Sequence, residues 1–490
     1  MKNNEADLLR VRHTGPLLKS DSARVLLRAF NPTTEQRSLQ IIARICALPE
    51  EEVRSELARI LREFSDRHRG LQAYWLRRFE QLKALLLTDS PVSEERKLLI
   101  GAYFTQEYAL EGAALFNPSL VWHPDQSGVS PGSQRFVLSL RATGEGHISS
   151  IAFRTGIVDA TNHITVEEAT RFVTSPASVS YPPYERTLFE RKLHEMDHRD
   201  DLVASVLSTL KEQFTLDELK TSVSLVQRQS RGILGSAPQL NSMLTLARAN
   251  YVATFLPEQP LSERVLFPTS PTEINGIEDA RFVAFRDDDG KTTYYATYTA
   301  YDGKVTMPQL LQTNDFLSFE MTTLNGPEIH NKGMALFPRR INGRYAMLSR
   351  QDNENIFLMC SDHLHFWYTK EVLLKPTYPW EYVQMGNCGS PIETDAGWLV
   401  LTHGVGPMRQ YAIGAILLDK DDPSHVIGRL HEPLLTPLPQ EREGYVPNVV
   451  YSCGAQLHHD ELILPYAMSD STSSFAVIPL TDILGAMKLT

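Results

Sequence analysis

Short strand-forming segments separated by turn residues fill most of the second half of this chain. Thr292–Tyr301 is rich in β-branched and aromatic residues, and Asp302-Gly303 follows it as a turn signal. A second pair of predicted strands follows within residues 344–360. The pattern Asp-x-Leu-x-Phe begins at Asp315 and again at Asp362, a spacing within the roughly 40–50 residues of propeller repeats. Several short strands per repeat at this spacing favour a β-propeller.

Two stretches replace the strand pattern with helical periodicity. The first covers residues 33–110 and includes a helix predicted at Glu94–Leu110. The second runs from about Tyr184 to Phe255, between prolines, and includes a helix predicted at Ser242–Phe255. The fold class expected is therefore mainly β, with an N-terminal helical extension and an inserted helical segment. Such a segment closes a site, builds a homo-oligomer interface or only packs on the rim, and the sequence leaves these alternatives open.

Bulk composition excludes several classes of protein. The net charge of −11 argues against nonspecific nucleic-acid binding. No stretch approaches the ~20 apolar residues that span a bilayer. The first residues, Met1 to Asp7, contain no apolar core of a signal peptide. The four cysteines are widely spaced and predict reduced thiols. We therefore expect a cytoplasmic protein with neither nucleic-acid nor membrane partners.

The segment Ile274–Phe282 carries the clearest chemistry. Glu278 and Asp279 stand beside Arg281, after the turn-forming pair Asn275-Gly276. Two carboxylates beside a cation can differ in pKa, which general acid catalysis requires. A neighbouring carboxylate raises the pKa of an acid and an arginine lowers it, so the net effect cannot be read from sequence. The alternative is a solvated surface charge cluster.

Several further motifs accompany this segment in a fixed order. They are Phe116-Asn-Pro-Ser119, Leu138-Ser-Leu-Arg141, Gly276-Ile-Glu-Asp-Ala-Arg281, Tyr298-Thr-Ala-Tyr-Asp302, Lys332-Gly-Met-Ala-Leu-Phe-Pro338, His403-Gly-Val405, Val446-Pro-Asn-Val-Val450 and Ser469-Asp470. With these motifs the chain resembles glycoside hydrolase family 130, the β-mannoside phosphorylases and β-mannosidases. The resemblance covers residues ~113–182 and ~257–490. It implies a five-bladed propeller. We therefore expect residues 1–112 to form an N-terminal strand and helical extension, and residues 113–490 to form the catalytic propeller domain, with a helical insertion at about 183–256.

The resemblance also implies roles for individual residues. Asp279 would be the general acid, protonating the glycosidic oxygen through the 3-hydroxyl of the bound mannose. Inorganic phosphate would be a co-substrate, and no cofactor is implied. The implied substrate-binding residues are Asn117, Arg141, Glu278, Arg281 and Asp470, and the implied phosphate-binding residues are Lys332 and His403. The structural alternatives are a turn before Pro118 for Asn117 and a Ser-Asp-Ser turn for Asp470.

The resemblance implies inverting cleavage of β-manno-oligosaccharides, and we expect phosphorolysis rather than hydrolysis. One departure favours hydrolysis, because residues 304–309 lack the arginine that the phosphorylase pattern carries there. Lys304 or Arg409 would have to replace it. An inverting β-mannosidase would instead need a carboxylate base, for which Glu381 and Glu443 are candidates. A non-catalytic glycan-binding propeller is the alternative from a different class.

A second motif points to another chemistry. His194-Glu-Met-Asp-His198 matches the zinc peptidase pattern, in which two histidines on one helical face bind the metal. The charged residues that follow, Arg199-Asp200-Asp201, favour an exposed polar helix. We therefore predict no metal at this motif.

Overall fold

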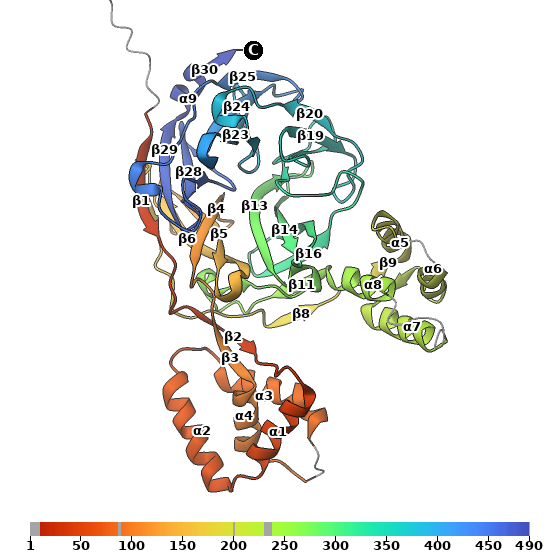
Figure 1. Ribbon diagram of the computed structural model, residues 1–490. Coiled ribbons are helices and arrows are strands. Elements are labelled where there is room, and N and C mark those ends of the chain that lie inside the picture. Colours follow the sequence, from red (N-terminus) through yellow and green to blue (C-terminus); the bar gives the residue numbers. More distant parts are fainter. Residues whose placement is uncertain (1–9, 87–89, 199–200, 230–237, 490) are drawn as a thin grey trace, which may run out of the picture.

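The computed structural model describes residues 10–86, 90–198, 201–229 and 238–489. Strands hold more of these residues than helices do, and they form largely antiparallel sheets that follow one another around a common centre (Figure 1), so the mainly β class is confirmed. None of the helices in these ranges is long and apolar enough to cross a membrane.

The first two groups of strands are linked into one large sheet. One group is β4 (Ala114–Trp122), β5 (Gln134–Thr143) and β6 (Ser149–Val158), flanked by β7 (Ile164–Val166) and β12 (Val265–Leu266). The other is β13 (Gly276–Arg286), β14 (Thr292–Tyr301), β15 (Thr306–Thr313) and β16 (Ser318–Thr323), extended by β11 (Tyr251–Thr254) and β8 (Ser178–Ser180). Only the parallel pair Gly276–Ser149 joins β13 to β6, so the two groups are distinct meanders that touch at one point.

Three further sheets complete the circle. One is β17 (Ala335–Leu336), β18 (Tyr345–Ser349), β19 (Ile356–Ser361) and β20 (Glu371–Leu374). The next is β21 (Gln384–Asn387), β22 (Ile392–Thr394), β23 (Gly397–Val405), β24 (Tyr411–Leu418), β25 (Val426–Leu430) and β30 (Met487–Leu489). The last is β26 (Val450–Tyr451), β27 (Gln456–His458), β28 (Glu461–Met468), β29 (Thr472–Pro479) and β1 (Arg12–Leu18).

The strand β1 was not predicted, and it joins the two ends of the chain. It pairs antiparallel with β29, with Arg12 opposite Val477 and Thr14 opposite Phe475. Arg10 adds a two-pronged contact to Asp482 at 2.7 and 2.9 Å. The last sheet is therefore built from both chain ends.

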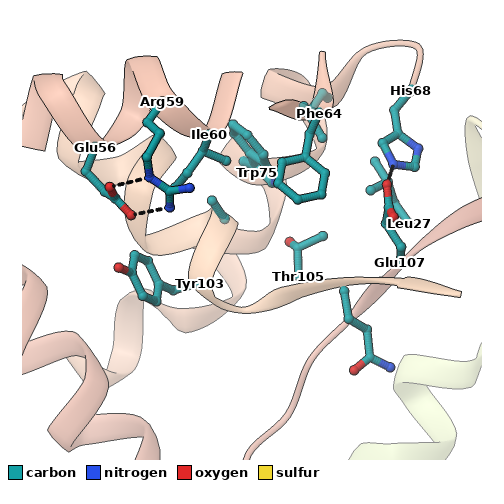
Figure 2. Close-up of a pocket in the computed structure, with 13 residues that line it drawn as sticks. Leu27, Glu56, Arg59, Ile60, Phe64, His68, Trp75, Tyr103, Thr105 and Glu107 are labelled. Carbon is teal, nitrogen blue, oxygen red and sulfur yellow. Dashed lines mark hydrogen bonds and ion pairs between the residues drawn. The ribbon is translucent and has the colours of Figure 1, made fainter. Parts of the chain in front are cut away.

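The N-terminal helices form a separate group below the sheets (Figure 1). They are α1 (Glu35–Cys46), α2 (Glu50–Phe64), α3 (Leu71–Leu82) and α4 (Glu94–Tyr103). The predicted helix Glu94–Leu110 is wrong in its second half, because residues 105–109 form β3 and pair with β2 (Val25–Ala29). Figure 2 shows a pocket of about 280 Å³ in this group, lined by Phe64 and Trp75 among others.

Buried ion pairs fix this helical group to the sheets. Glu111 is fully buried, and both of its oxygens accept hydrogen bonds from Arg154 at 2.9 Å. Arg24 lies 3.2 Å from the same carboxylate. Arg69, which lies between α2 and α3, makes a two-pronged contact of 2.8 and 2.9 Å with the fully buried Glu263. Because an unpaired buried charge is costly, these contacts hold the junction in one arrangement.

The inserted helices project from the outer edge of the second meander (Figure 1). They are α5 (Arg186–Glu195), α6 (Asp201–Ser208), α7 (Leu216–Gln229) and α8 (Pro238–Arg248), with a short ladder of β9 (Tyr184–Glu185) and β10 (Gln213–Phe214). The predicted helix Ser242–Phe255 ends early, because β11 pairs with β16 and β8 instead.

The zinc peptidase motif does not form one helical face. Helix α5 ends at Glu195, and Asp197 has a left-handed backbone with φ of 62°, so His198 leaves the helix. The Glu195 carboxylate accepts a hydrogen bond from the Gly326 amide at 3.0 Å and thereby docks α5 on the loop before β17. Within the described ranges, no group of three His, Cys, Asp or Glu side chains is placed to hold a metal.

A repeated turn precedes the first strand of three sheets. The single-turn helices η4 (Pro271–Glu273), η5 (Pro379–Glu381) and η7 (Pro439–Glu441) all read Pro-x-Glu and precede β13, β21 and β26. In each, the glutamate is buried and accepts backbone N–H groups of the residues just before the turn. This capping box fixes the direction in which the chain enters the sheet.

Candidate active site

Two β-bulges turn Asn117 and Asp279 toward each other. The β4–β5 register shifts between Phe116 and Ser119, and the β13–β14 register shifts between Glu278 and Arg281. Inside these bulges Asn117 and Asp279 have left-handed backbones, with φ of 50° and 52°. Non-glycine residues rarely adopt this conformation, and it concentrates at functional sites. The Asn117 Nδ2 donates to Asp279 Oδ1 at 2.6 Å, so the turn alternative for Asn117 does not account for its position.

Arg141 connects both carboxylates of the central motif. Its Nη2 donates to Glu278 at 2.8 Å, its Nη1 to Asp279 at 3.3 Å, and its Nε to Ser149 Oγ at 2.8 Å. Burial lowers the pKa of Arg141, but Asp279, Glu278 and Asp470 raise it more, so the guanidinium is firmly charged. Predicted substrate-binding residues of three different meanders thus lie around one cation.

Two acids in this site have opposite pKa shifts. Asp279 is 6% exposed, and its burial raises its pKa, but Arg141, Lys332 and Arg281 outweigh burial and hold the pKa below its usual range. Burial and the charge of Asp279 together raise the pKa of Asp470 to about 6, against the opposing effect of Arg141. Without ligand, Asp279 is ionised, whereas Asp470 titrates at a pH of about 6.

Arg281 is buried and contacts the backbone of Asp279 rather than its carboxylate. Its side chain is 2% exposed and donates to the Asp279 carbonyl oxygen at 3.0 Å and to the Tyr451 hydroxyl at 2.8 Å. The geometry brings it under Asp279 without a hydrogen bond to the carboxylate. This differs from the substrate-binding role that the motif implied.

Lys332 and His403 lie near Asp279. Lys332 acts electrostatically on both Asp279 and Asp470. His403 is fully buried, and its pKa is lowered by burial and by the nearby Arg350 and Arg281, so the imidazole is neutral. Its Nε2 has no hydrogen-bond partner among the described residues. A neutral imidazole with a free nitrogen beside cations is suited to an anion that carries a hydroxyl.

Arg350 is a residue that the sequence motifs did not identify. It follows β18, is buried, and its Nε has no partner within the described ranges. A Cβ at Gly333 would lie 2.5 Å from the Arg350 side chain, and a Cβ at Gly386 would lie 2.5 Å from His403 and 2.6 Å from Arg350. The two glycines therefore make room for this guanidinium. The Lys332-Gly333 pair was the available signal, because a glycine after the lysine marks a close approach.

Other candidates from the sequence lie elsewhere. Lys304 is in the exposed turn between β14 and β15. Glu381 is fully engaged as the cap of η5 and as the partner of Arg429, so it is not free to act as a base. Glu443 is exposed, in the segment between η7 and β26. Arg409 helps to lower the pKa of Asp470 and therefore lies near the site.

Several known proteins are similar to this chain. A family model described as beta-1,4-mannooligosaccharide phosphorylase matches residues 258–489. A 1,2-beta-oligomannan phosphorylase of Thermoanaerobacter sp. (strain X514) is 36% identical over 230 residues, which cover 46% of this chain and 75% of that protein. A beta-1,2-mannobiose phosphorylase of Listeria innocua is 32% identical over 234 residues, covering 46% of this chain and 63% of that protein. A solved beta-1,2-mannobiose phosphorylase from Listeria innocua, in complex with beta-1,2-mannobiose, covers 77% of this chain and 92% of its own at 23% identity, with a TM-score of 0.46. This chain therefore belongs to glycoside hydrolase family 130 and is a carbohydrate-active enzyme.

Proposed function

We propose that this enzyme is an inverting β-mannoside phosphorylase that releases mannose 1-phosphate from the end of a β-manno-oligosaccharide. The observation that carries the proposal is the cluster of Lys332, Arg350 and the neutral His403 near the acid Asp279. Phosphorolysis needs an anion site next to a proton donor, and Arg and Lys are the usual phosphate ligands. The relatives named phosphorylases support the same reading.

Asn117, Arg141, Glu278 and Asp470 hold the terminal mannose in this proposal. Short amide and carboxylate side chains bind vicinal hydroxyls, and the arginine keeps the two acids of the motif in place. Asp279 passes a proton through the 3-hydroxyl of mannose to the departing oxygen. A phosphate oxygen attacks the anomeric carbon, the glycosidic bond breaks, and the proton that phosphate loses balances the one gained by the leaving alcohol.

The low pKa of Asp279 sets a requirement on this mechanism. The acid must be protonated when the glycosidic bond breaks, although cations hold it ionised in the free enzyme. Bound phosphate offsets the charge of Lys332, and bound sugar displaces water from the carboxyl. Both changes raise the pKa of Asp279. Proton donation is therefore expected only in the ternary complex.

One of the two candidate bases of the hydrolase alternative, Glu381, is not free to act. An inverting hydrolase needs a carboxylate that activates water at ~6.5–9.5 Å from the acid. Glu381 is held in its turn by backbone amides and Arg429. Arg350 provides the cation that residues 304–309 do not supply. These two observations favour phosphorolysis.

We also propose a five-bladed propeller for residues 113–490, with residues 1–112 as an extension and the helices within 183–256 as an insertion. The blades would be β4–β6, β13–β16, β17–β20, β21–β25 and β26–β29. Support comes from five successive antiparallel meanders and from the single residue pair between the first two. The N-terminal strand β1 would complete the fifth blade.

The test is a panel of β-1,2-, β-1,3- and β-1,4-mannobioses, each incubated with and without phosphate. Phosphate-dependent formation of mannose 1-phosphate is expected from at least one of them. Lys332→Ala and Arg350→Ala should each raise the KM for phosphate more than the KM for the mannoside. Arg344→Ala is the matched control, because Arg344 stands at the opposite, exposed end of β18. Free mannose as the sole product, at a rate indifferent to phosphate, would show that the enzyme is a hydrolase.

A further inference from the structure

Two hairpins on different sheets share one unusual loop. Thr143 pairs with Ser149 and Val405 pairs with Tyr411, and each pair encloses five residues. Both loops begin with an extended glycine, Gly144 at φ −114° and Gly406 at φ −111°. Their third and fourth residues are left-handed: Gly146 and His147 in one, Met408 and Arg409 in the other.

A third hairpin repeats the left-handed pair. In the β28–β29 turn Ser469 and Asp470 have φ of 47° and 49°. The second left-handed residue of each pair is therefore His147 in the first hairpin, Arg409 in the second and Asp470 in the third. The left-handed backbone of Met408 costs free energy, whereas the equivalent residue of the other loop is Gly146, which adopts it freely. The Met408 side chain is 89% exposed, so packing does not offset that cost. Strain without a packing reason points to function.

Arg409 and His147 both lie near residues of the site. Arg409 is close enough to Asp470 to lower its pKa, against burial and Asp279, which raise it. His147 is two residues from Ser149, which accepts the Nε–H of Arg141 at 2.8 Å. The hairpins of β5–β6 and β23–β24 therefore flank the one that carries Asp470.

An exposed aromatic ring lies beside His147, in a loop that packs on the Asp470 hairpin. Tyr445 is 59% exposed, its hydroxyl lies 3.2 Å from His147 Nδ1, and the two ring centroids are 5.4 Å apart. Its loop is packed on the Asp470 hairpin, since a Cβ at Gly444 would lie 2.5 Å from the Ser469 carbonyl oxygen. The Val446 amide donates to that same oxygen at 3.0 Å. Tyr445 is thus held in place while its ring stays open to solvent.

We propose that Tyr445, His147 and Arg409 bind the acceptor sugar, the residue from which mannose is cleaved. This proposal rests on the proposed function, which places the terminal mannose at Asn117 and Asp279. The next sugar then extends outward past Asp470. A pyranose has an apolar face of C–H groups that stacks on a tyrosine ring, and its hydroxyls accept hydrogen bonds from imidazole and guanidinium.

The test compares a ligand that reaches the acceptor position with one that does not. Binding of the preferred β-mannobiose and of mannose 1-phosphate is measured by calorimetry in phosphate-free buffer, in an Asp279→Asn background that suppresses turnover. Tyr445→Ala should weaken β-mannobiose binding about 10-fold and leave mannose 1-phosphate unchanged within about two-fold. Tyr445→Phe should lose only a few-fold, because the ring remains. Tyr103→Ala is the control, an exposed tyrosine of the remote helical group (Figure 2).

Each outcome decides the proposal. Equal weakening of both ligands would place Tyr445 at the mannose position, and no weakening of either would remove it from the site; both results overturn the acceptor assignment. A wild-type protein that binds no β-mannobiose also overturns it. If β-mannobiose binding depends on Tyr445 but wild type forms no mannose 1-phosphate, the acceptor assignment stands and phosphorolysis fails.

Discussion

Binding of a dianion beside Lys332, Arg350 and His403 should be accompanied by proton uptake at Asp470. Its pKa of about 6 means that about a tenth of the carboxyl is protonated at pH 7. At an effective dielectric constant near 20, two unit charges about 8 Å apart interact by roughly 2 kcal/mol, and closer charges interact more strongly. We therefore expect a bound dianion to raise the pKa of Asp470 by at least about one.

The magnitude follows from that shift. A pKa near 7 in the complex makes about half of the carboxyl protonated at pH 7, so each bound dianion takes up ~0.4 proton. Because the complex holds more protons than the free enzyme, affinity must rise as pH falls. The linkage predicts roughly five-fold tighter binding at pH 6 than at pH 8. His403 contributes little, because burial already keeps its pKa well below this range.

Sulfate is the suitable probe, because it stays a dianion throughout and adds no titration of its own. Calorimetry in two buffers of different ionisation enthalpy gives the number of protons taken up. Asp470→Asn should abolish most of the uptake and flatten the pH dependence of the Kd. Proton release, or the same uptake in Asp470→Asn as in wild type, would refute the electrostatic reasoning.

Three shorter predictions concern catalysis, stability and metal. Asp279→Asn should lower kcat by roughly 10²–10⁴-fold, as mannose 1-phosphate release would measure, with the far-UV circular dichroism of wild type; full activity would exclude it as the acid. Glu111→Gln leaves two buried arginines underpaired and should cost ~3–5 kcal/mol in urea unfolding, whereas the exposed Glu63→Gln should cost less than ~1 kcal/mol; equal losses would refute the argument. His198→Ala should change neither metal content nor activity, and one zinc per chain lost in this variant would revive the peptidase.

Local pattern was sufficient for strands whose neighbours in sequence are also their neighbours in space. Thr292–Tyr301 was predicted with the bounds of β14, since it lies within a meander of consecutive hairpins. The sequence pattern failed where a strand pairs with strands that are far from it in the sequence. Tyr251–Thr254 follows a helix and reads as its last turn, but it becomes a strand because β16 and β8 offer it partners on both edges. No local signal carries that information.

The same contrast between local and distant information applies to the site residues. The motifs named the residues that surround Asp279, because these stand in short segments with recognisable neighbours. Arg350 was missed because nothing beside it in sequence marks it, and its place depends on Gly333 and Gly386 from two other segments. The pKa order of Asp279 and Asp470 was likewise beyond the sequence, since it arises from cations on several sheets.

The pairing of β1 with β29 has a consequence for biosynthesis. A ribosome that adds roughly 5–20 residues per second finishes residues 12–18 about 20–90 s before it reaches residues 472–479. During that interval the nascent first strand has no native partner, and an unpaired strand edge invites aggregation. The last sheet can therefore be completed only after residues 472–479 have been made, and chaperone capture of the waiting segment is expected to matter more for yield than the stability of the finished protein.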